Sequence, residues 1–247
     1  MVDKNFKTAK VLGIDVNLFD FSSCVEAVID YIKSKKGAQV VTINPEMFET
    51  AQKNSDFKEI ISAAEFVVPD GVGVKLALKL KGINQPTIPG VELSSSLIEY
   101  CAKNGLNVAL IGTKQDILED AVSNLTKKYE NLKISYSRNG FFTSEEEGEI
   151  IGALVSSSPS LVLVALGSPK QEFFIKRARE VLRESVFIGV GGSFDVWAGR
   201  VERAPLIFRK LWLEWLYRTI KEPKRFKRIF PTLPLFLFKV IMDMNKR

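Results

Sequence analysis

The stretch LVLVALGSPKQEFFIKRAREVLRE (161–184) decides the fold class of this sequence. Residues 161–166 are all apolar, which predicts a β-strand buried on both faces. Gly167 and Ser168 interrupt this run, and Pro169 suits the first turn of a helix. Over 170–184, apolar residues recur at helical spacing: Phe173, Phe174, Ala178, Val181 and Leu182. A buried strand, a short turn and an amphipathic helix form the repeating unit of an open parallel sheet with helices on both faces.

The same unit recurs along most of the chain. Short apolar runs predict five further strands, at 39–43, 65–69, 107–111, 133–137 and 186–190. Helical spacing predicts further helices, among them 22–36, 91–104 and 114–129. The sequence therefore predicts an α/β fold with a mostly parallel sheet of about six strands.

The composition excludes several kinds of chemistry. Of 247 residues, 46% are hydrophobic and 26% are charged, which is typical of a globular protein. The chain has no histidine, which excludes a Ser-His-Asp triad, a Cys-His pair and histidine metal ligands. Cys24 and Cys101 lie in helical patterns, so we expect two buried thiols rather than a disulfide, and two cysteines cannot close a zinc site. We expect no metal and no cofactor.

The net charge of +6 is unevenly distributed along the chain. From residue 200 onward, 13 Lys and Arg face 4 Asp and Glu, whereas residues 1–199 carry 22 basic and 25 acidic groups. We therefore divide the chain into a sheet domain, 1–199, and a basic, aromatic, helical appendage, 200–247. Such an appendage is typical of contact with a polyanion or an anionic membrane surface. The alternative is a solvated helical face packed permanently on the body.

Two further absences suggest where the protein acts. The N-terminal residues 1–16 lack the apolar core of a signal peptide. The most apolar late stretch, 229–241, is too short to span a bilayer and contains two prolines and a lysine. We therefore expect a cytoplasmic protein that is peripheral to the membrane.

Small and polar residues follow the predicted strands, and ligands of open parallel sheets bind beyond the carboxyl ends of the strands. Small residues let a ligand approach the backbone, and a helix that starts after them offers N–H groups to a phosphate. The turn residues expected to do so are Gly112, Thr113, Gly167, Ser168, Lys170, Gln171 and Gly191. The GSPKQE motif (167–172) is the strongest element, although an ordinary capped turn would have the same spacing. Neither a Walker loop nor a GxGxxG fingerprint is present.

Acidic residues at two of these turns are candidates for proton transfer. Asp70 follows an apolar strand and precedes Gly71, where partial desolvation would favour a general base; its alternative role is to cap the next helix. Asp195 could be a base, a ribose-binding carboxylate or a cap. Thr42 lies within a predicted strand, where threonine is common for structural reasons.

Taken together, six segments resemble the WecG/TagA/CpsF family of bacterial glycosyltransferases. They run in order across most of the chain: TINPEMF (42–48), VVPDGVGV (67–74), LIGTKQDILEDA (110–121), VALGSPKQEFFI (164–175), IGVGGSFDVWAGRVERAP (188–205) and LEWLYRTIKEPKRFKR (213–228). The resemblance implies a Rossmann-like sandwich and an inverting, metal-independent transferase. It further implies transfer of N-acetylmannosamine from a UDP donor to the GlcNAc of undecaprenyl-diphosphate-GlcNAc, which makes the β-1,4-linked disaccharide lipid of wall teichoic acid linkage-unit synthesis. Some members use the uronic acid of that sugar.

The resemblance also assigns residues. Asp70 matches the family's proposed base, and Thr42 matches a residue beside it. The nucleotide-sugar pocket would include Asn44, Gln171 and Asp195. The arginines expected to reach the diphosphate from the appendage are Arg218, Arg225 and Arg228, and the appendage is the family's membrane-targeting element. Where many members read Arg-[Ile/Val]-Pro-Gly, this chain has Thr87, so one positive charge near the site is missing.

The expected partners follow from this assignment. They are a UDP-sugar, a polyprenyl-diphosphate-linked GlcNAc, the anionic inner face of the cell membrane and, in one interpretation, further copies of the chain. Two other classes of function remain open at this point. One is a UDP-binding module without catalysis at the membrane. The other is a nucleic-acid binder, which the confinement of charge to the appendage disfavours.

Overall fold

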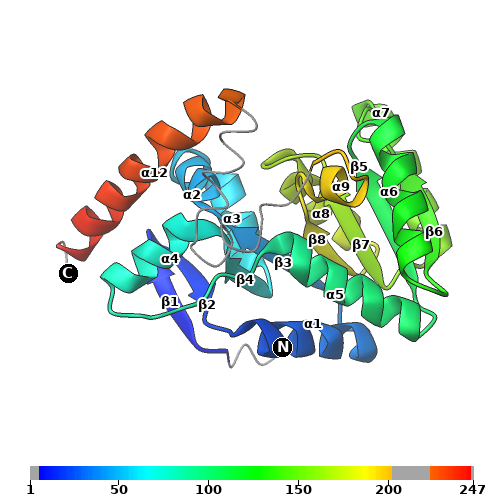
Figure 1. Ribbon diagram of the computed structural model, residues 1–247, viewed down its shortest axis with the longest axis horizontal. Coiled ribbons are helices and arrows are strands. Elements are labelled where there is room, and N and C mark those ends of the chain that lie inside the picture. The colour runs from blue at the N-terminus through cyan, green and yellow to red at the C-terminus, as the bar shows by residue number, and fades with distance from the viewer. Residues whose placement is uncertain (1–5, 202–222, 246–247) are drawn as a thin grey trace.

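The computed structural model describes residues 6–201 and 223–245, with the side chains of the last helix described from Thr232 onward. Its centre is a six-stranded sheet in the order β4-β3-β8-β7-β5-β6, and every strand pair in it is parallel (Figure 1). The strands are β3 (Ala38–Ile43), β4 (Phe66–Pro69), β5 (Asn107–Gly112), β6 (Lys133–Arg138), β7 (Leu161–Ala165) and β8 (Val186–Gly189). All six predicted strands are confirmed.

Burial along the strands explains why their sequences differ. The residues of β4 and β7 are buried without exception, because helices cover both faces of the sheet there. The edge strand β6 instead alternates exposed and half-buried residues. Its sequence, KISYSR, is accordingly the most polar of the six.

One face of the sheet packs against α1 (Phe21–Ser34), α5 (Gly90–Lys103), α6 (Gln115–Lys128) and α9 (Ser193–Trp197). The opposite face packs against two groups of helices. One group is α2 (Pro45–Lys53), α3 (Ser55–Ala63) and α4 (Gly71–Leu80), over β3 and β4. The other is α7 (Ser144–Ser157) and α8 (Lys170–Arg179), over β5 and β7. The helices after neighbouring strands β3, β8 and β7 therefore alternate between faces, which opens a crevice at their carboxyl ends.

Two features differ from the sequence-based expectation. An antiparallel hairpin of β1 (Thr8–Val11) and β2 (Ile14–Asn17) precedes the sheet and was not predicted. It turns at Leu12 and Gly13, both with positive φ. The helix predicted over 170–184 ends at Arg179, so that Val181, expected on its apolar face, is 58% exposed. Pro169 precedes the first turn of this helix rather than lying in it.

The last helix, α12 (Pro223–Met244), packs across α2 and α4. Phe236 and Val240 are fully buried in the same core as these helices, and the ring of Phe236 lies 5.1 Å from that of Phe48. Lys239 pairs with Glu49 at 2.6 Å. This part of the predicted appendage thus shares a core with the body, while the boundary at residue 200 stays a prediction.

Both cysteines are buried, free thiols, as predicted. Burial raises the pKa of each, Cys24 and Cys101, to about 12. Within the described ranges, no helix is long and apolar enough to cross a bilayer.

Candidate active site

The helix N-termini at the carboxyl edge of the sheet fall into two classes. Those of α2 and α7 are capped by the side chains of Asn44 and Thr143. Those of α4, α6, α8 and α9, which follow β4, β5, β7 and β8, have no side-chain cap. The uncapped termini thus include those that follow β8, β7 and β5, three neighbouring strands of the sheet. Unsatisfied N–H groups and the positive end of a helix dipole make such termini suitable for anions.

Thr42 and Asp70 lie together at the ends of β3 and β4. Thr42 pairs in register with Val68, and the Asp70 N–H donates to the Ile43 carbonyl at 2.9 Å. Asp70 occupies the N-cap position of α4, but its side chain makes no capping hydrogen bond, so capping does not explain this carboxylate. It is partly exposed at the edge of the sheet.

The segment around Thr87 lies against the same two strand ends. The Ile88 N–H donates to the Pro69 carbonyl at 2.8 Å. Gly90 packs so closely on Thr42 that an added Cβ would lie 3.0 Å from the Thr42 hydroxyl oxygen. The segment in which this chain has Thr87 instead of arginine therefore borders the predicted catalytic pair.

Asn44 has a structural role. Its side-chain oxygen accepts the Met47 N–H at 3.1 Å and caps α2, so this oxygen is already used within the protein. Helix α4 approaches the start of α2 closely, since a Cβ at Gly73 would lie 2.5 Å from the Pro45 side chain. The amide nitrogen of Asn44 and the second lone pair of its oxygen are still able to bind a ligand.

The GSPKQE motif joins the ends of β7 and β8. Gly167 and Gly191 both have positive φ, +77° and +48°, which favours glycine. Gln171 is 5% exposed and lies between the two turns, where its side-chain oxygen accepts the Gly191 N–H at 3.3 Å. Its side-chain nitrogen donates to Glu172 at 2.8 Å. The Gln171 amide therefore bonds in two directions, and both partners are protein groups.

Glu172 was not assigned a role from the sequence. Its side chain is 2% exposed, and burial raises the pKa of its carboxyl, an effect that the neighbouring Gln171 amide and Ser168 hydroxyl partly offset. The sequence of the motif could have drawn attention to Glu172. A glutamate three residues after the N-cap residue often accepts a hydrogen bond from the N-cap N–H. Here the N-cap residue is Pro169, which has no N–H, so Glu172 cannot make that bond.

Besides the residues at the ends of β3 and β4 and those at the ends of β7 and β8, a third group of predicted site residues lies at the ends of β5 and β6. Gly112, with φ +128°, packs against the backbone of Ala165, and Thr113 N–H donates to the Ala165 carbonyl at 3.0 Å. Beside them opens a cleft of about 600 Å³. Its lining includes Thr113, Phe141, Thr143, Lys170 and Arg177. Lys170 also belongs to the GSPKQE turn, so it connects the cleft with the β7–β8 group.

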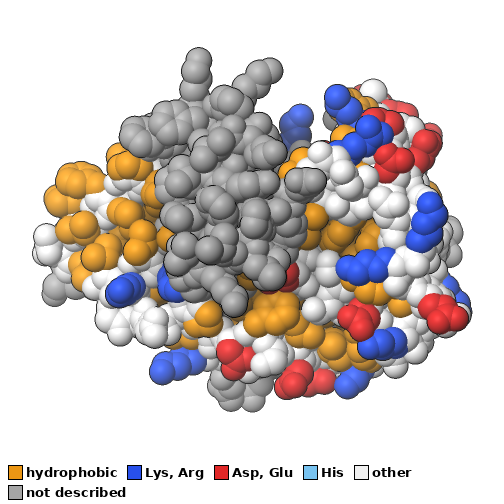
Figure 2. All heavy atoms as spheres, in the orientation of Figure 1, with side chains coloured by type: hydrophobic (Ala, Val, Ile, Leu, Met, Phe, Trp, Pro, Cys, Tyr) orange, Lys and Arg blue, Asp and Glu red, His pale blue; other side chains and the backbone are white. Residues whose placement is uncertain are grey.

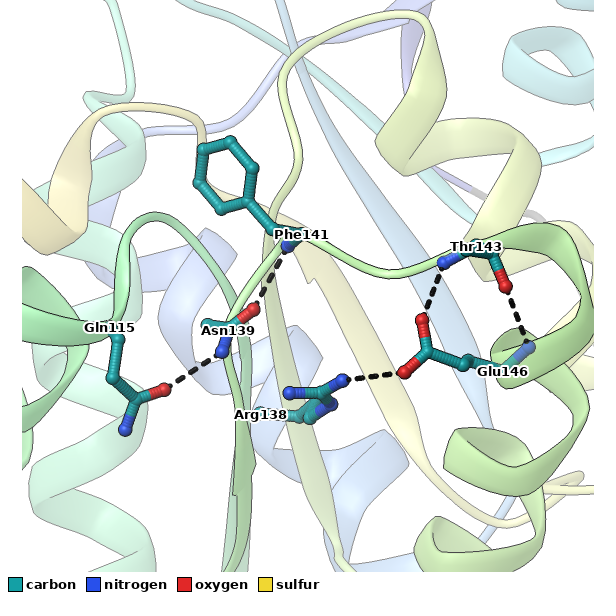
Figure 3. A network of polar contacts seen from close by, with 6 residues as sticks. All are labelled: Gln115, Arg138, Asn139, Phe141, Thr143 and Glu146. Atoms are coloured by element: carbon teal, nitrogen blue, oxygen red, sulfur yellow. Dashed lines mark hydrogen bonds and ion pairs between the residues drawn. The ribbon is translucent and has the colours of Figure 1, made fainter.

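A polar network holds the loop that carries Phe141 (Figure 3). Asn139 donates to Gln115 at 2.8 Å and accepts the Phe141 N–H at 3.0 Å. Arg138 donates to Glu146 at 3.1 Å, and Glu146 completes the cap of α7. The Phe141 ring projects away from these contacts and is 71% exposed. An exposed aromatic ring on a braced loop at the mouth of a cleft is suited to stacking on a planar ligand.

Asp195 lies in the first turn of α9, on the opposite face of the sheet from α8. Its main-chain carbonyl accepts the N–H groups of Arg200 and Val201, at 2.9 and 3.1 Å. Its half-exposed side chain lies close to Gly192. These contacts use the backbone of Asp195, so its carboxylate remains suited to act as a base or to bind a ribose. The predicted capping role is not observed, because α9 has no side-chain cap.

The sheet order places the three groups in one row. From Asp70 on β4 the row runs past Thr42 on β3, Gly191 on β8 and Gln171 by β7 to Thr113 after β5. Strands lie about 4.8 Å apart, so four intervals span roughly 19 Å. A second groove of about 590 Å³, between α5, α6 and α9, is lined by none of the predicted site residues. We therefore take the row at the strand ends as the candidate active site.

Three predicted residues are not placed by this geometry. Arg218 lies outside the described residues, as do Trp212 and Trp215, and the side chains of Arg225 and Arg228 in the first turns of α12 are not described. Among the residues that are described, no three Cys, Asp or Glu side chains are grouped to hold a metal.

Comparison with known proteins places this geometry in context. The glycosyl transferase WecG/TagA/CpsF family matches residues 9–247. An N-acetylglucosaminyldiphosphoundecaprenol N-acetyl-beta-D-mannosaminyltransferase of Bacillus spizizenii (strain W23) is 33% identical over 229 residues, which cover 92% of this chain and 87% of the relative. The protein of the same name from Bacillus subtilis (strain 168) is 34% identical over 235 residues, 95% of this chain and 90% of the relative. The similarity therefore extends over the whole sheet and α12.

Proposed function

The chain belongs to the WecG/TagA/CpsF family of glycosyl transferases, and from this premise we propose that it transfers N-acetylmannosamine from UDP-N-acetylmannosamine to GlcNAc-diphosphoundecaprenol. The acceptor and the transferred sugar are those in the names of two relatives that cover most of the chain. The UDP carrier and entry of the product into wall teichoic acid are parts of the proposal. The alternative within the same family is transfer of the corresponding uronic acid.

In the proposed reaction Asp70 is the general base. Its carboxylate takes the proton of the acceptor GlcNAc hydroxyl as that oxygen forms a bond to the anomeric carbon of the donor. The bond from the anomeric carbon to UDP breaks on the opposite side, and UDP departs with the bonding electrons. Attack opposite the leaving group inverts the configuration and gives a β-linkage. The partly exposed position of Asp70, its lack of a capping bond and its proximity to Thr42 support this role.

Charge on the departing UDP needs compensation. The uncapped N-terminus of α8, the side chain of Lys170 and the glycine turn at Gly191 support a diphosphate site at the ends of β7 and β8. Arg218, Arg225 and Arg228 are proposed to add positive charge from the appendage. These groups would do so without a metal, and we propose that transfer persists in EDTA.

The cleft beside Phe141 supports a place for the nucleoside. With the diphosphate at β7 and β8, the sugar would point toward Asp70 and the base toward Thr113 and Phe141, because the three groups lie in that order along the sheet. Lys170, which lines the cleft, lies at the junction. The row is elongated, as a nucleotide-sugar is.

An exposed apolar surface supports a membrane-bound position. The α4–α12 apolar face consists of Leu76, Leu80, Leu235, Phe238, Ile241 and Met242, each 38–60% exposed. The two helices run side by side in the same direction, since Gly73 lies against Leu233 and Lys81 pairs with Asp243 at 3.7 Å. Figure 2 shows hydrophobic side chains gathered over these helices, at the left of the view. Large exposed apolar patches are typical of partner or membrane contacts.

We propose that this face and the basic appendage together hold the protein on the inner face of the cell membrane. Phe238→Glu should reduce sedimentation with anionic liposomes. Phe141→Glu, which changes another largely exposed ring near the cleft, is the matched control and should leave sedimentation unchanged. Equal sedimentation of both variants and the parent protein would contradict a role for this face.

The reaction is tested by identifying the product. Full-length protein is incubated with a lipid-diphosphate-linked GlcNAc and equal amounts of UDP-N-acetylmannosamine and its uronic acid form. Mass spectrometry should show the acceptor gaining one N-acetylmannosamine. Gain of the uronic acid would favour the alternative, and no transfer from either donor would contradict the proposal.

A further inference from the structure

Glutamates occupy the same position in two helices of the same face but make different contacts. In α7, Glu146 is three residues after the N-cap residue Thr143, and the two side chains satisfy each other's N–H groups. In α8, Glu172 is three residues after Pro169, which has no N–H to offer. Glu172 therefore cannot close a capping box, and its carboxylate faces a different partner.

Its hydrogen-bond partner is the amide of Gln171, and the neighbouring Ser168 hydroxyl also favours the ionised carboxylate. Glu172 Oε1 accepts the hydrogen bond from Gln171 Nε2 at 2.8 Å, while Oε2 is buried and accepts none from the described residues. At the other end of the amide, Gln171 Oε1 accepts the Gly191 N–H. A Cβ at Gly189 would lie 2.4 Å from Nε2, so the absence of a side chain there lets the amide lie against β8.

These contacts define which way the amide points. The two ends of a glutamine amide are nearly equal in shape, so only hydrogen bonds set its orientation. An ionised carboxylate accepts only, and a backbone N–H donates only. Between Glu172 and Gly191, Gln171 must therefore turn its nitrogen toward Glu172 and its oxygen toward Gly191.

We propose that Glu172 is a positioning residue that orients the Gln171 amide, so that the second Nε2 hydrogen is available to the UDP-sugar. This inference rests on the proposed function, in which Gln171 binds the donor. A buried carboxylate with one oxygen unsatisfied is costly for stability. The raised pKa of Glu172 reflects that cost. A role in orienting a ligand-binding amide accounts for a group that helix capping does not.

A double-mutant cycle read by UDP binding tests this inference. Glu172→Gln, Gln171→Ala and the double variant are made in the full-length chain, and UDP affinity is measured by calorimetry. Gln171→Ala should weaken UDP binding about tenfold, and Glu172→Gln, which keeps the size but removes the obligatory acceptor, by about fivefold. The double variant should bind no more weakly than Gln171→Ala, because Glu172 acts only through Gln171.

Glu146→Gln is the matched control, since it changes the glutamate at the same helical position in α7. It should lower thermal stability through the cap. Because Glu146 also braces the loop of Phe141, Glu146→Gln should weaken UDP binding less than Glu172→Gln does. If Glu172→Gln does not fold, Glu172→Asp is used in the same cycle. Aspartate keeps the charge, but its shorter side chain places the carboxylate farther from the Gln171 amide.

Each outcome separates the two proposals. Two outcomes would overturn the positioning role alone. In the first, the fold-losses of UDP affinity in the two single variants multiply in the double variant. In the second, Glu172→Gln binds UDP with parental affinity while Gln171→Ala binds it more weakly. Unchanged affinity in Gln171→Ala would overturn both that role and the assignment of Gln171 to the donor site. Absence of UDP binding by the parent protein would instead contradict the proposed function.

Discussion

The N-termini of α7 and α8 lie on the same face of the sheet and border the same cleft, yet only that of α7 is closed. Thr143 and Glu146 satisfy its first N–H groups, and Arg138 braces Glu146. The first turn of α8 begins after Pro169, has no side-chain cap and presents Lys170 at the surface. Capping stabilises a helix by about 1 kcal/mol, so an uncapped terminus forgoes stability. The difference suggests that α7 braces the site and that α8 binds within it.

The largest effect is expected at another uncapped terminus, that of α4. Asp70→Asn removes the proposed base without changing its size, so turnover should fall by about 10²-fold or more while UDP affinity changes little. Steady-state kinetics and a UDP titration on the same preparation measure both. Near-parental turnover would remove Asp70 from the mechanism and leave its missing cap unexplained.

The comparison of α7 with α8 is sharpened by paired alanine variants. Lys170→Ala should weaken UDP binding roughly tenfold, and the loss should shrink at high salt because screening reduces the contribution of an exposed charge. Thr143→Ala should instead cost about 1 kcal/mol of folding stability and weaken UDP binding much less than Lys170→Ala does. Calorimetry and thermal unfolding separate the two responses. If Thr143→Ala weakens UDP binding as much as Lys170→Ala, both termini bind the nucleotide and the contrast fails.

A smaller effect is expected from Phe141, on the loop between β6 and α7. Stacking of a base on an aromatic ring contributes about 1 kcal/mol at its lower limit, so Phe141→Ala should weaken UDP binding about fivefold. Because the ring is 71% exposed, thermal stability should not change. Uridine alone should show the same fold-loss. A loss confined to stability would mean that the ring packs rather than binds.

The smallest and most specific prediction concerns pH. Burial raises the pKa of the Glu172 carboxyl above its unfolded value, so the native state binds this proton more tightly than the unfolded state does. This favourable contribution is complete below the ordinary pKa of 4.5 and is lost as pH rises through the raised value. The stability of Glu172→Gln relative to the parent protein should therefore increase from pH 4 to pH 7. Urea unfolding at both pH values measures this, and a constant difference would contradict an ionised, buried Glu172.

Sequence patterns were sufficient for the sheet because five of its six strands are almost fully buried and therefore largely apolar, and the exposed strand β6 still alternates with the period of a strand. They were weaker where contacts distant in sequence decide. The hairpin of β1 and β2 is short and depends on packing against α3 and α4. The early end of α8 leaves Val181 exposed while Leu182 is buried, a choice that helical spacing alone does not make.

The candidate site was also only partly predictable from the sequence. Its location at the strand ends was predictable, because parallel topology brings the ends of all strands to one edge. The roles of individual side chains were not. Asn44 fits both a cap and a ligand contact in sequence, and only the bond to Met47 shows that its oxygen caps α2. Glu172 was not predicted because its burial, not its residue type, makes it unusual. Phe141 was not predicted because the exposure of its ring depends on the loop that the polar network holds.

Hydrogen–deuterium exchange of the full-length protein with and without UDP tests most directly whether the uncapped helix N-termini form the donor site. Binding at the open N-termini should slow exchange of the backbone amides in 167–171, 191–193 and 112–113. The first-turn amides of α7, already held by Thr143 and Glu146, should exchange at the same rate in both states. Protection of the α7 turn, or of none of the three other turns while UDP is bound, would contradict the claim that the uncapped termini form the donor site.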